Sequence, residues 1–285
     1  MGERTTLPLR ILSRSRLGST RQTGINRESN SAGVWWREVA WREPACTLEN
    51  EMLRLRTLGG LTLYRGDEAL TGAATQRRRL AVLALLAGFR AAGLSRDKLM
   101  AYLWPESDDE RARHVLNQLL YAQRRQFGED GLFLGQKTLR LNPAVVWSDL
   151  DAFEAALDGD QPAKAVSLYL GPFLDGFFLK GAPEFDRWAE AQRDRLARRF
   201  QSAISSLARR SAAGGEWESA IDWWRRGIDA NPLDPQAALG LLEALIESGD
   251  RPAAIRYARE YEERLRSELE VAPDPAFTSL VDRIR

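Results

Sequence analysis

Residues 107–127 carry a clear helical pattern with one apolar side and one side crowded with hydrogen-bonding groups. At a step of about 100° per residue, the apolar side chains share one face of a helix: Ala112, Val115, Leu116, Leu119, Leu120 and Phe127. The opposite face collects polar and cationic side chains: Arg111, Arg113, His114, Asn117, Gln118, Tyr121, Arg124 and Arg125. A helix of this kind buries its apolar side in a core. The segment therefore predicts an amphipathic surface helix.

The polar face has the chemistry that base recognition needs. Arginine pairs bidentately with guanine in the major groove, and asparagine or glutamine pairs with adenine. From Arg111 to Arg125 the face is roughly 21 Å long at a rise of about 1.5 Å per residue. Most polar helix faces are merely solvated, so the neighbouring segments decide between the two interpretations.

Those neighbours predict a helix-turn-helix with a wing. Residues 107–110 read Ser-Asp-Asp-Glu, a capping box with Ser107 as the N-cap. Residues 95–104 predict a short preceding helix with its own N-cap serine, and residues 76–89 predict a buried helix that is apolar almost all round. Downstream, residues 132–141 alternate around a Gly-Gln-Lys turn, which predicts a hairpin with Lys137 at its tip. Two helices and a hairpin in this order favour DNA binding.

The rest of the chain divides into two folding patterns. Alternating stretches between residues 53 and 70 predict a small antiparallel sheet before the helices. After residue 149 the pattern is helical throughout, with a long helix expected over residues 183–211. The segment Gly-Glu-Trp-Glu-Ser-Ala-Ile at residues 215–221 recurs as Gly-Asp-Arg-Pro-Ala-Ala-Ile at residues 249–255. The glycines and the alanines are each offset by 34 residues, which is typical of tetratricopeptide repeats. We expect an α+β winged helix-turn-helix domain at residues 51–148 and an all-α TPR-like helical repeat domain at residues 149–285.

Charge and composition further limit the class of protein that this chain can be. Residues 1–46 carry eight Lys and Arg against four Asp and Glu, whereas residues 149–285 carry eighteen against twenty-five. A basic front and an acidic rear suit a nucleic-acid contact at one end. The single cysteine, Cys46, rules out an intramolecular disulfide, and the sequence contains no run of 18 apolar residues. We expect a cytoplasmic protein with no membrane contact, and residues 1–50 to form a disordered basic N-terminal arm.

Several motifs together resemble a known family, the bacterial transcriptional activator domain (BTAD) proteins of the Streptomyces antibiotic regulatory protein (SARP) type. The most specific are Leu-Trp-Pro-Glu at residues 103–106 and Tyr-Leu-Gly-Pro-Phe-Leu-Asp-Gly-Phe at residues 169–177. Further segments that carry the resemblance lie at residues 55–61, 96–99, 112–116, 148–153 and 184–188.

This resemblance implies an OmpR-like winged helix followed by a helical repeat domain. Such a regulator binds repeated sites upstream of a promoter, often as a side-by-side pair, and contacts RNA polymerase to activate transcription. By position, the family's recognition helix includes Arg113, Asn117, Gln118, Tyr121 and Arg124, and its wing includes Lys137. ATPase-fused members are far longer, and OmpR-type response regulators carry a preceding receiver domain. We therefore expect neither nucleotide-driven switching nor phosphoacceptor control.

Alternatives remain for individual residues and for the function. His114 is the only histidine, so it can form neither a catalytic pair nor a metal cluster with another; it either contacts DNA or is solvated. Arg77 begins a run of three arginines that is either structural or in contact with phosphate. No phosphate-binding glycine loop occurs, and we expect no enzyme activity, cofactor or metal. The alternative function is a TPR-type adaptor whose winged helix binds protein rather than double-stranded DNA.

Overall fold

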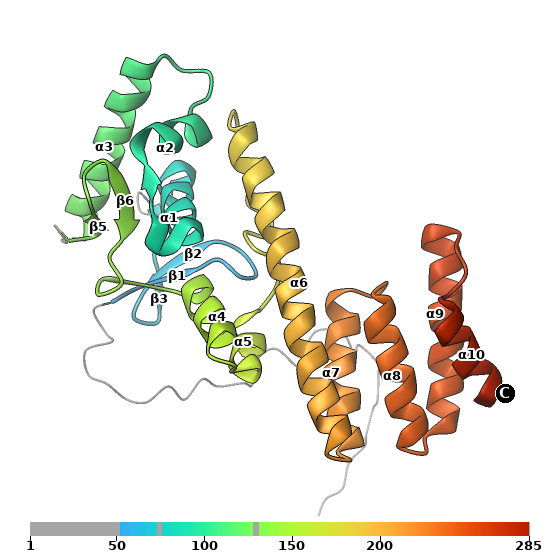
Figure 1. Ribbon diagram of the computed structural model, residues 1–285. Coiled ribbons are helices and arrows are strands. Elements are labelled where there is room, and N and C mark those ends of the chain that lie inside the picture. The colour runs from blue at the N-terminus through green and yellow to red at the C-terminus, as the bar shows by residue number, and fades with distance from the viewer. Residues whose placement is uncertain (1–51, 73–75, 128–130, 285) are drawn as a thin grey trace, which may run out of the picture. The chain divides into compact units, whose positions relative to one another are not determined.

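The computed structural model describes residues 52–72, 76–127 and 131–284 (Figure 1). The expected N-terminal arm, residues 1–50, lies outside these residues. The first part of the described chain contains short strands and a group of helices: β1 (Leu53–Arg56), β2 (Thr62–Arg65), β3 (Glu68–Ala69), α1 (Arg77–Phe89), the 3-10 helix η2 (Arg90–Ala92), β4 (Leu94–Ser95), α2 (Arg96–Leu103), α3 (Asp109–Phe127), β5 (Phe133–Leu134), β6 (Thr138–Leu141) and β7 (Val146–Ser148).

The first sheet has the strand order β3-β2-β1-β7. Strands β1, β2 and β3 pair antiparallel, as the alternation predicts, with Leu55 opposite Leu63. The fourth strand was not expected. Strand β7 pairs parallel to β1, with Leu53 opposite Val146, and so returns the chain to the first sheet before the helical part begins.

The helices α1, α2 and α3 form close to the predicted boundaries. Ser95 caps α2, its Oγ accepting a hydrogen bond from the Lys98 amide at 3.2 Å. The expected capping box of α3 is wrong by one residue. Asp108 is the cap, because its Oδ1 accepts from the Arg111 amide at 2.8 Å and its carbonyl accepts from Ala112. The Ser107 amide instead donates to the carbonyl of Trp104, which places Ser107 in the turn between α2 and α3.

The hairpin after α3 belongs to a second, three-stranded sheet of order β4-β6-β5. Its turn requires Gly135, which has a φ of 86° and whose added Cβ would lie 2.1 Å from the carbonyl oxygen of Thr138. Strand β4 lies directly before α2, and Leu94 pairs with Leu139 of β6. The sheet therefore fixes the hairpin to the N-terminus of α2.

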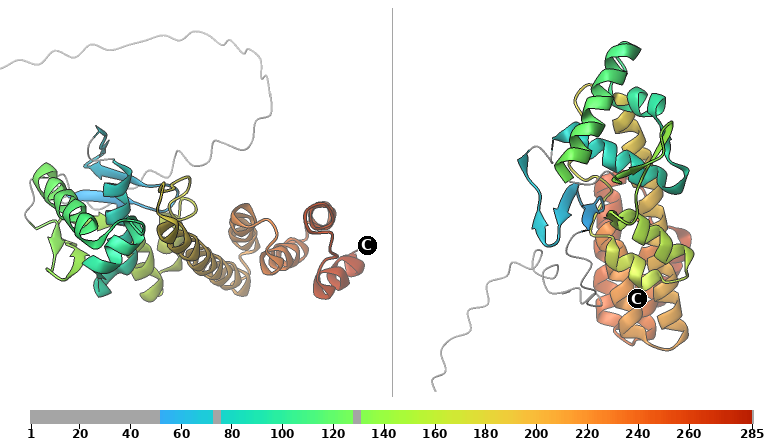
Figure 2. Two further views of the ribbon diagram at one scale, coloured as in Figure 1. Left: turned by 90° about the horizontal axis from the view of Figure 1, so that it is seen from above. Right: turned by 90° about the vertical axis from the view of Figure 1, so that its left-hand side faces the viewer.

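The second part of the chain is helical, as expected: α4 (Asp149–Asp158), α5 (Pro162–Leu168), α6 (Pro183–Ala213), α7 (Trp217–Ala230), α8 (Pro235–Glu247), α9 (Arg251–Leu269) and α10 (Pro275–Ile284). From α6 to α10 each helix packs against the next (Figure 2). The 34-residue offset has a structural counterpart, because Ala220 of α7 and Ala254 of α9 are both fully buried. Gly215 and Gly249 each precede these helices with positive φ.

The hydrophobic core is not divided where the strands give way to helices. One cluster of buried residues runs from Leu53 to Ile204, and a second runs from Ala208 to Ile284. The boundary between the cores therefore lies inside α6. The N-terminal half of α6, together with α4 and α5, shares its core with the strands and with α1, α2 and α3.

Trp188 of α6 fits closely against this N-terminal part. Its ring stacks on Phe89 at the end of α1, with centroids 6.1 Å apart, and meets Phe173 and Phe185 at 5.6 Å. A Cβ added to Gly88 would lie 2.4 Å from the Trp188 ring. Only a glycine at this position lets α1 and α6 approach so closely.

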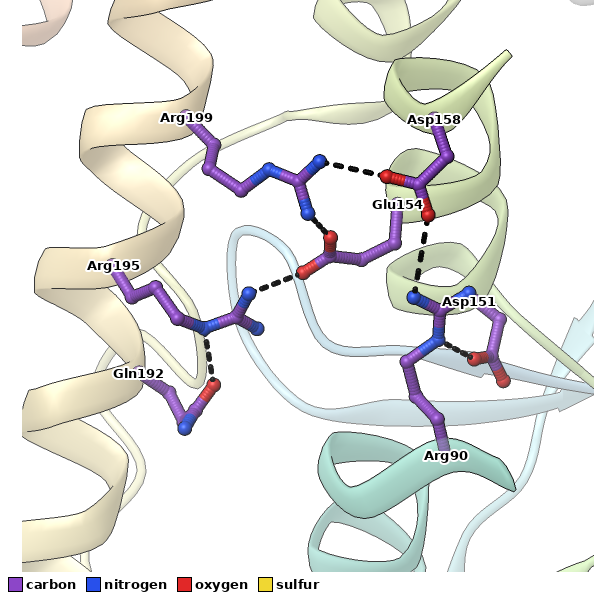
Figure 3. Close-up of polar contacts among 7 residues, drawn as sticks. All are labelled: Arg90, Asp151, Glu154, Asp158, Gln192, Arg195 and Arg199. Carbon is purple, nitrogen blue, oxygen red and sulfur yellow. Dashed lines mark hydrogen bonds and ion pairs between the residues drawn. The ribbon is translucent and has the colours of Figure 1, made fainter. Parts of the chain in front are cut away.

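Two polar arrangements hold α4 against its neighbours. The buried carboxylate of Asp149 accepts hydrogen bonds from Thr57 and Leu58 at the end of β1. Glu154, whose side chain is 2% exposed, lies between Arg195 and Arg199 of α6 (Figure 3). Arg90 extends this network to Asp151 at 2.8 Å and to Asp158 at 4.0 Å. The network ties η2, which directly follows α1, to α4 and α6.

Candidate nucleic-acid interface

The outward face of α3 is exposed over most of its length. The predicted residues that are exposed are Arg111, Arg113, His114, Asn117, Gln118, Tyr121 and Arg125. Tyr121 is 64% exposed, which is unusual for a large aromatic side chain in a core-facing helix. The face therefore presents guanidinium, amide, imidazole and phenol groups toward solvent. These are the side chains that donate to base edges and phosphates.

The inner face of α3 follows the predicted apolar pattern. Ala112, Leu116, Leu120 and Phe127 are buried, and Val115 and Leu119 are half-buried. Gln123 is also fully buried, which the periodicity did not predict. Its Nε2 donates to the carbonyl of Arg79 in α1 at 3.1 Å, so a polar contact adds to the packing of α3 on α1.

Arg124 is half-buried rather than fully outward. Its guanidinium lies 5.8 Å from the centroid of the Phe133 ring in β5, within the range of a cation–π contact. The last turns of α3 therefore contact the hairpin directly. Lys137 lies in the turn between β5 and β6 and is exposed, as is Arg140 of β6.

Arg96 is a residue of this surface that sequence reasoning did not select. It is the first residue of α2, and its Nη1 donates to Oδ1 of Asn117 at 2.6 Å. Its Nε donates to the carbonyl of Gln136 at 2.8 Å, and its backbone amide donates to the carbonyl of Lys137 at 3.2 Å. One side chain thus joins α2, α3 and the hairpin turn. Only a sequence signal linking residues 96, 117 and 136 could have identified it.

His114 and Gln118 pair with each other along α3. The two Nε2 atoms are 2.8 Å apart, at the i to i+4 spacing of neighbours on a helix. The Nε2 of Gln118 is an amide nitrogen and can only donate, so this bond requires the His114 tautomer whose Nε2 accepts.

The arginine run at the start of α1 makes several contacts within the protein. Arg77 is exposed and donates to the carbonyl of Phe178 at 2.8 Å, and Arg78 lies over the ring of Trp104. Arg79 donates to the side-chain carbonyl of Gln126 near the end of α3 at 2.8 Å. This supports the structural interpretation of the run. A phosphate contact by Arg77 stays a prediction.

The start of α3 limits where an anion can approach. Asp108, Asp109 and Glu110 are all exposed there. Acidic groups at a helix N-terminus stabilise the helix dipole, but they repel phosphates. A polyanion would therefore meet α3 from Arg111 onward and reach the hairpin turn beside Arg96.

The part of the chain that the structure describes contains no group of three or more His, Cys, Asp and Glu side chains able to hold a metal ion. Within the same residues, no helix is both long and apolar enough to cross a lipid bilayer.

Residues 149–285 match the protein family described as Bacterial transcriptional activator domain. This part of the chain is a bacterial transcriptional activator domain. The resemblance expected from its motifs is thereby confirmed at the level of the family. The description of this family points to a regulator of transcription.

Two known proteins are similar to this chain over most of its length. Regulatory protein AfsR from Streptomyces griseus is 26% identical over 254 residues, which cover 85% of this chain and 26% of AfsR. The chain therefore spans about a quarter of that relative. A solved structure of Mycobacterium tuberculosis EmbR in complex with a low-affinity phosphopeptide matches with a TM-score of 0.58 and 20% identity. The match covers 81% of this chain and 64% of EmbR, and it supports the fold.

Proposed function

We propose that this chain is a sequence-specific DNA-binding activator of transcription. In this proposal residues 51–148 form an OmpR-type winged helix, with α3 as its recognition helix and the β5–β6 hairpin as its wing. Residues 149–285 form the activator domain with TPR-like repeats. The observation that carries the proposal is the exposed donor face of α3, which Arg96 holds beside the hairpin turn that contains Lys137.

The side chains divide into two roles. We assign base edges in the major groove to the outward residues of α3, with Arg113 and Asn117 as the principal readers. Phosphates on either side are assigned to Lys137, Arg140 and Arg77, because such contacts position a protein without reading sequence. The remaining polar residues of α3, including the half-buried Arg124, contact either a base edge or a phosphate, whichever lies opposite them: Arg111, His114, Gln118, Tyr121, Arg124 and Arg125.

The family and the charge distribution support the rest of the proposal. An activator must contact the transcription machinery, and the acidic second half of the chain offers a surface for RNA polymerase. Binding to promoter repeats would bring two copies side by side on DNA. The protein would act in the cytoplasm, where bacterial DNA lies. AfsR is named a regulatory protein, which agrees with this role.

The test is a gel shift with the DNA upstream of the chain's own gene, followed by selection of bound fragments from the whole genome. Arg113→Ala or Asn117→Ala should each raise the Kd about 5- to 150-fold and relax the preference at one base position. Arg225→Ala is the matched control, because Arg225 is an exposed arginine of α7 that lies 3.9 Å from Asp222. It should leave binding unchanged.

The outcome that would contradict the proposal is equally specific. If the folded wild-type protein shifted no DNA at any salt concentration, or if both α3 variants bound as the wild type does, α3 would not be a recognition helix. The adaptor function would then be favoured.

A further inference from the structure

The contact between Arg96 and Asn117 fixes which end of an amide faces outward. Arg96 Nη1 lies 2.6 Å from Oδ1 of Asn117. The two ends of an asparagine amide are usually assigned from their hydrogen-bond partners, and a guanidinium has only donors. The atom of Asn117 that faces Arg96 must therefore be the oxygen.

Arg96 is itself held in place. Its Nε donates to the carbonyl of Gln136, and its backbone amide donates to the carbonyl of Lys137. Ser95 caps the helix that begins at Arg96. The guanidinium is thus fixed from two sides by the hairpin turn before it contacts α3. It cannot turn away from Asn117 without losing the bond to the hairpin.

This arrangement changes what Asn117 offers to a base. Asparagine recognises adenine by accepting from N6 and donating to N7, which requires both the oxygen and the nitrogen of its amide. In this protein the oxygen is engaged in a charge-assisted hydrogen bond, which is about twice as strong as a neutral one. The oxygen keeps a second lone pair, but the cationic Arg96 beside it disfavours the approach of another donor, so the exposed Asn117 side chain offers a partner mainly its Nδ2 hydrogens.

We propose that Arg96 is a specificity-determining residue that holds Asn117 as a hydrogen-bond donor, so that Asn117 reads guanine rather than adenine. Guanine presents two adjacent acceptors, N7 and O6, in the major groove. This inference rests on the proposed function, in which α3 enters that groove. The hairpin holds Arg96, and Arg96 acts on the base through Asn117, as a positioning residue.

The experiment selects binding sites from randomised duplexes with four proteins: wild type, Asn117→Ala, Arg96→Met and the double variant. The wild type should prefer guanine over adenine at one position by about 5- to 150-fold, and Asn117→Ala should lose the preference there. Arg96→Met frees the amide oxygen and should move the preference at that position toward adenine. The double variant should behave as Asn117→Ala does, because Arg96 acts through residue 117.

Arg140→Met is the matched control. Arg140 lies in the same three-stranded sheet, and its Nη1 lies 3.5 Å from the carbonyl of Ala91. Its loss should weaken binding to all duplexes alike and leave the base preference unchanged. Should Arg96→Met fail to fold, Arg96→Lys serves instead, since one ammonium cannot bond both Asn117 and Gln136 as the guanidinium fork does. It should reduce the guanine preference.

A second measurement needs no DNA. In ¹⁵N-labelled protein the side-chain amide signals of Asn117, identified by their loss in Asn117→Ala, should shift in Arg96→Met and stay in place in Arg140→Met. Selection of adenine by the wild type, or an unchanged preference in Arg96→Met, would overturn the inference while leaving DNA binding intact. If the Asn117 signals shift in Arg96→Met but the wild type selects no sequence, the proposed function would be overturned instead.

Discussion

Asp149, the first residue of α4, accepts hydrogen bonds from both the amide and the hydroxyl of Thr57, 92 residues earlier in the chain. The bonds to its two carboxylate oxygens measure 2.7 to 2.9 Å, and the Leu58 amide adds another at 2.8 Å. Both Thr57 and Asp149 are buried. The first helix of the activator domain thus satisfies the backbone at the end of β1, and the two parts of the chain share this contact as they share a core.

Asp149→Asn should lower the free energy of unfolding by about 1 to 3 kcal/mol. An amide places an NH₂ group toward donors that need an acceptor, so buried amides of Thr57 and Leu58 lose partners. Urea denaturation followed by circular dichroism measures the loss. Asp234→Asn is the control, because Asp234 is an N-cap near the surface, where asparagine caps equally well. Equal stability of the two variants would show that the Thr57 contact contributes little.

The carboxyl of Asp149 also makes the stability of the folded protein depend on pH. Burial raises the pKa of Asp149, and the hydrogen bonds from Thr57 and Leu58 oppose that shift without cancelling it. A raised pKa in the folded state means that the folded protein binds the proton more tightly. The stability contributed by this proton is full below the unfolded pKa of about 3.9 and is lost as the pH rises through the folded pKa.

The measurement is the difference in unfolding free energy between wild type and Asp149→Asn across the acid range. The free energy of unfolding of the wild type should fall as the pH rises through the folded pKa of Asp149. The variant has no carboxyl at this position, so its free energy of unfolding lacks this dependence. The difference should therefore shrink with rising pH. A difference that grew with pH would show that the folded pKa is lowered instead.

Removing the buried anion of the ion-pair network should loosen α6 from α4. Glu154→Gln leaves Arg195 and Arg199 without their shared carboxylate. The side chains of these arginines are about a third exposed, so water compensates part of the loss, and we expect a cost of about 2 kcal/mol.

Asp160→Asn provides the comparison for Glu154→Gln. It breaks the exposed pair with Arg210, in which the Asp160 side chain is 80% exposed. That change should cost no more than about 0.5 kcal/mol. Equal effects of the two substitutions on the urea midpoint would exclude a structural role for the buried network.

Gly88→Ala tests the contact between α1 and α6. Alanine normally stabilises a helix interior by about 1 kcal/mol relative to glycine. Here the added methyl would lie 2.4 Å from the Trp188 ring, so we expect a net loss of about 1 to 3 kcal/mol. Trp188→Phe in the same protein should restore part of the stability by making room. A Gly88→Ala variant more stable than the wild type would contradict the packing of Trp188.

The parts of this fold that could be predicted are those that depend on residues close together in the sequence. Periodicity and the Ser95 cap gave α1, α2 and α3 to within a residue or two, because helical faces and caps depend on spacings of three and four. Alternation around Gly135 gave the hairpin. The exposed face of α3 follows from the same periodicity.

Contacts between distant residues could not be predicted in this way. The parallel pairing of β7 with β1, the Asp149–Thr57 bonds and the bridge from Arg96 to Asn117 each join segments that carry no shared local pattern. The same holds for Gln123, whose burial depends on a carbonyl of α1. The candidate site was therefore predictable as a face, while the groups that orient it were not.

The salt dependence of DNA binding tests the central claim most directly. If α3 and the hairpin dock on a duplex with about five phosphates neutralised, log K should fall with log salt at a slope near −4.5. Lys137→Ala should make the slope shallower by about 0.9 and weaken all sequences alike, whereas Asn117→Ala should weaken only the selected sequence with the slope unchanged. An affinity independent of salt, with Lys137→Ala matching the wild type, would contradict the account.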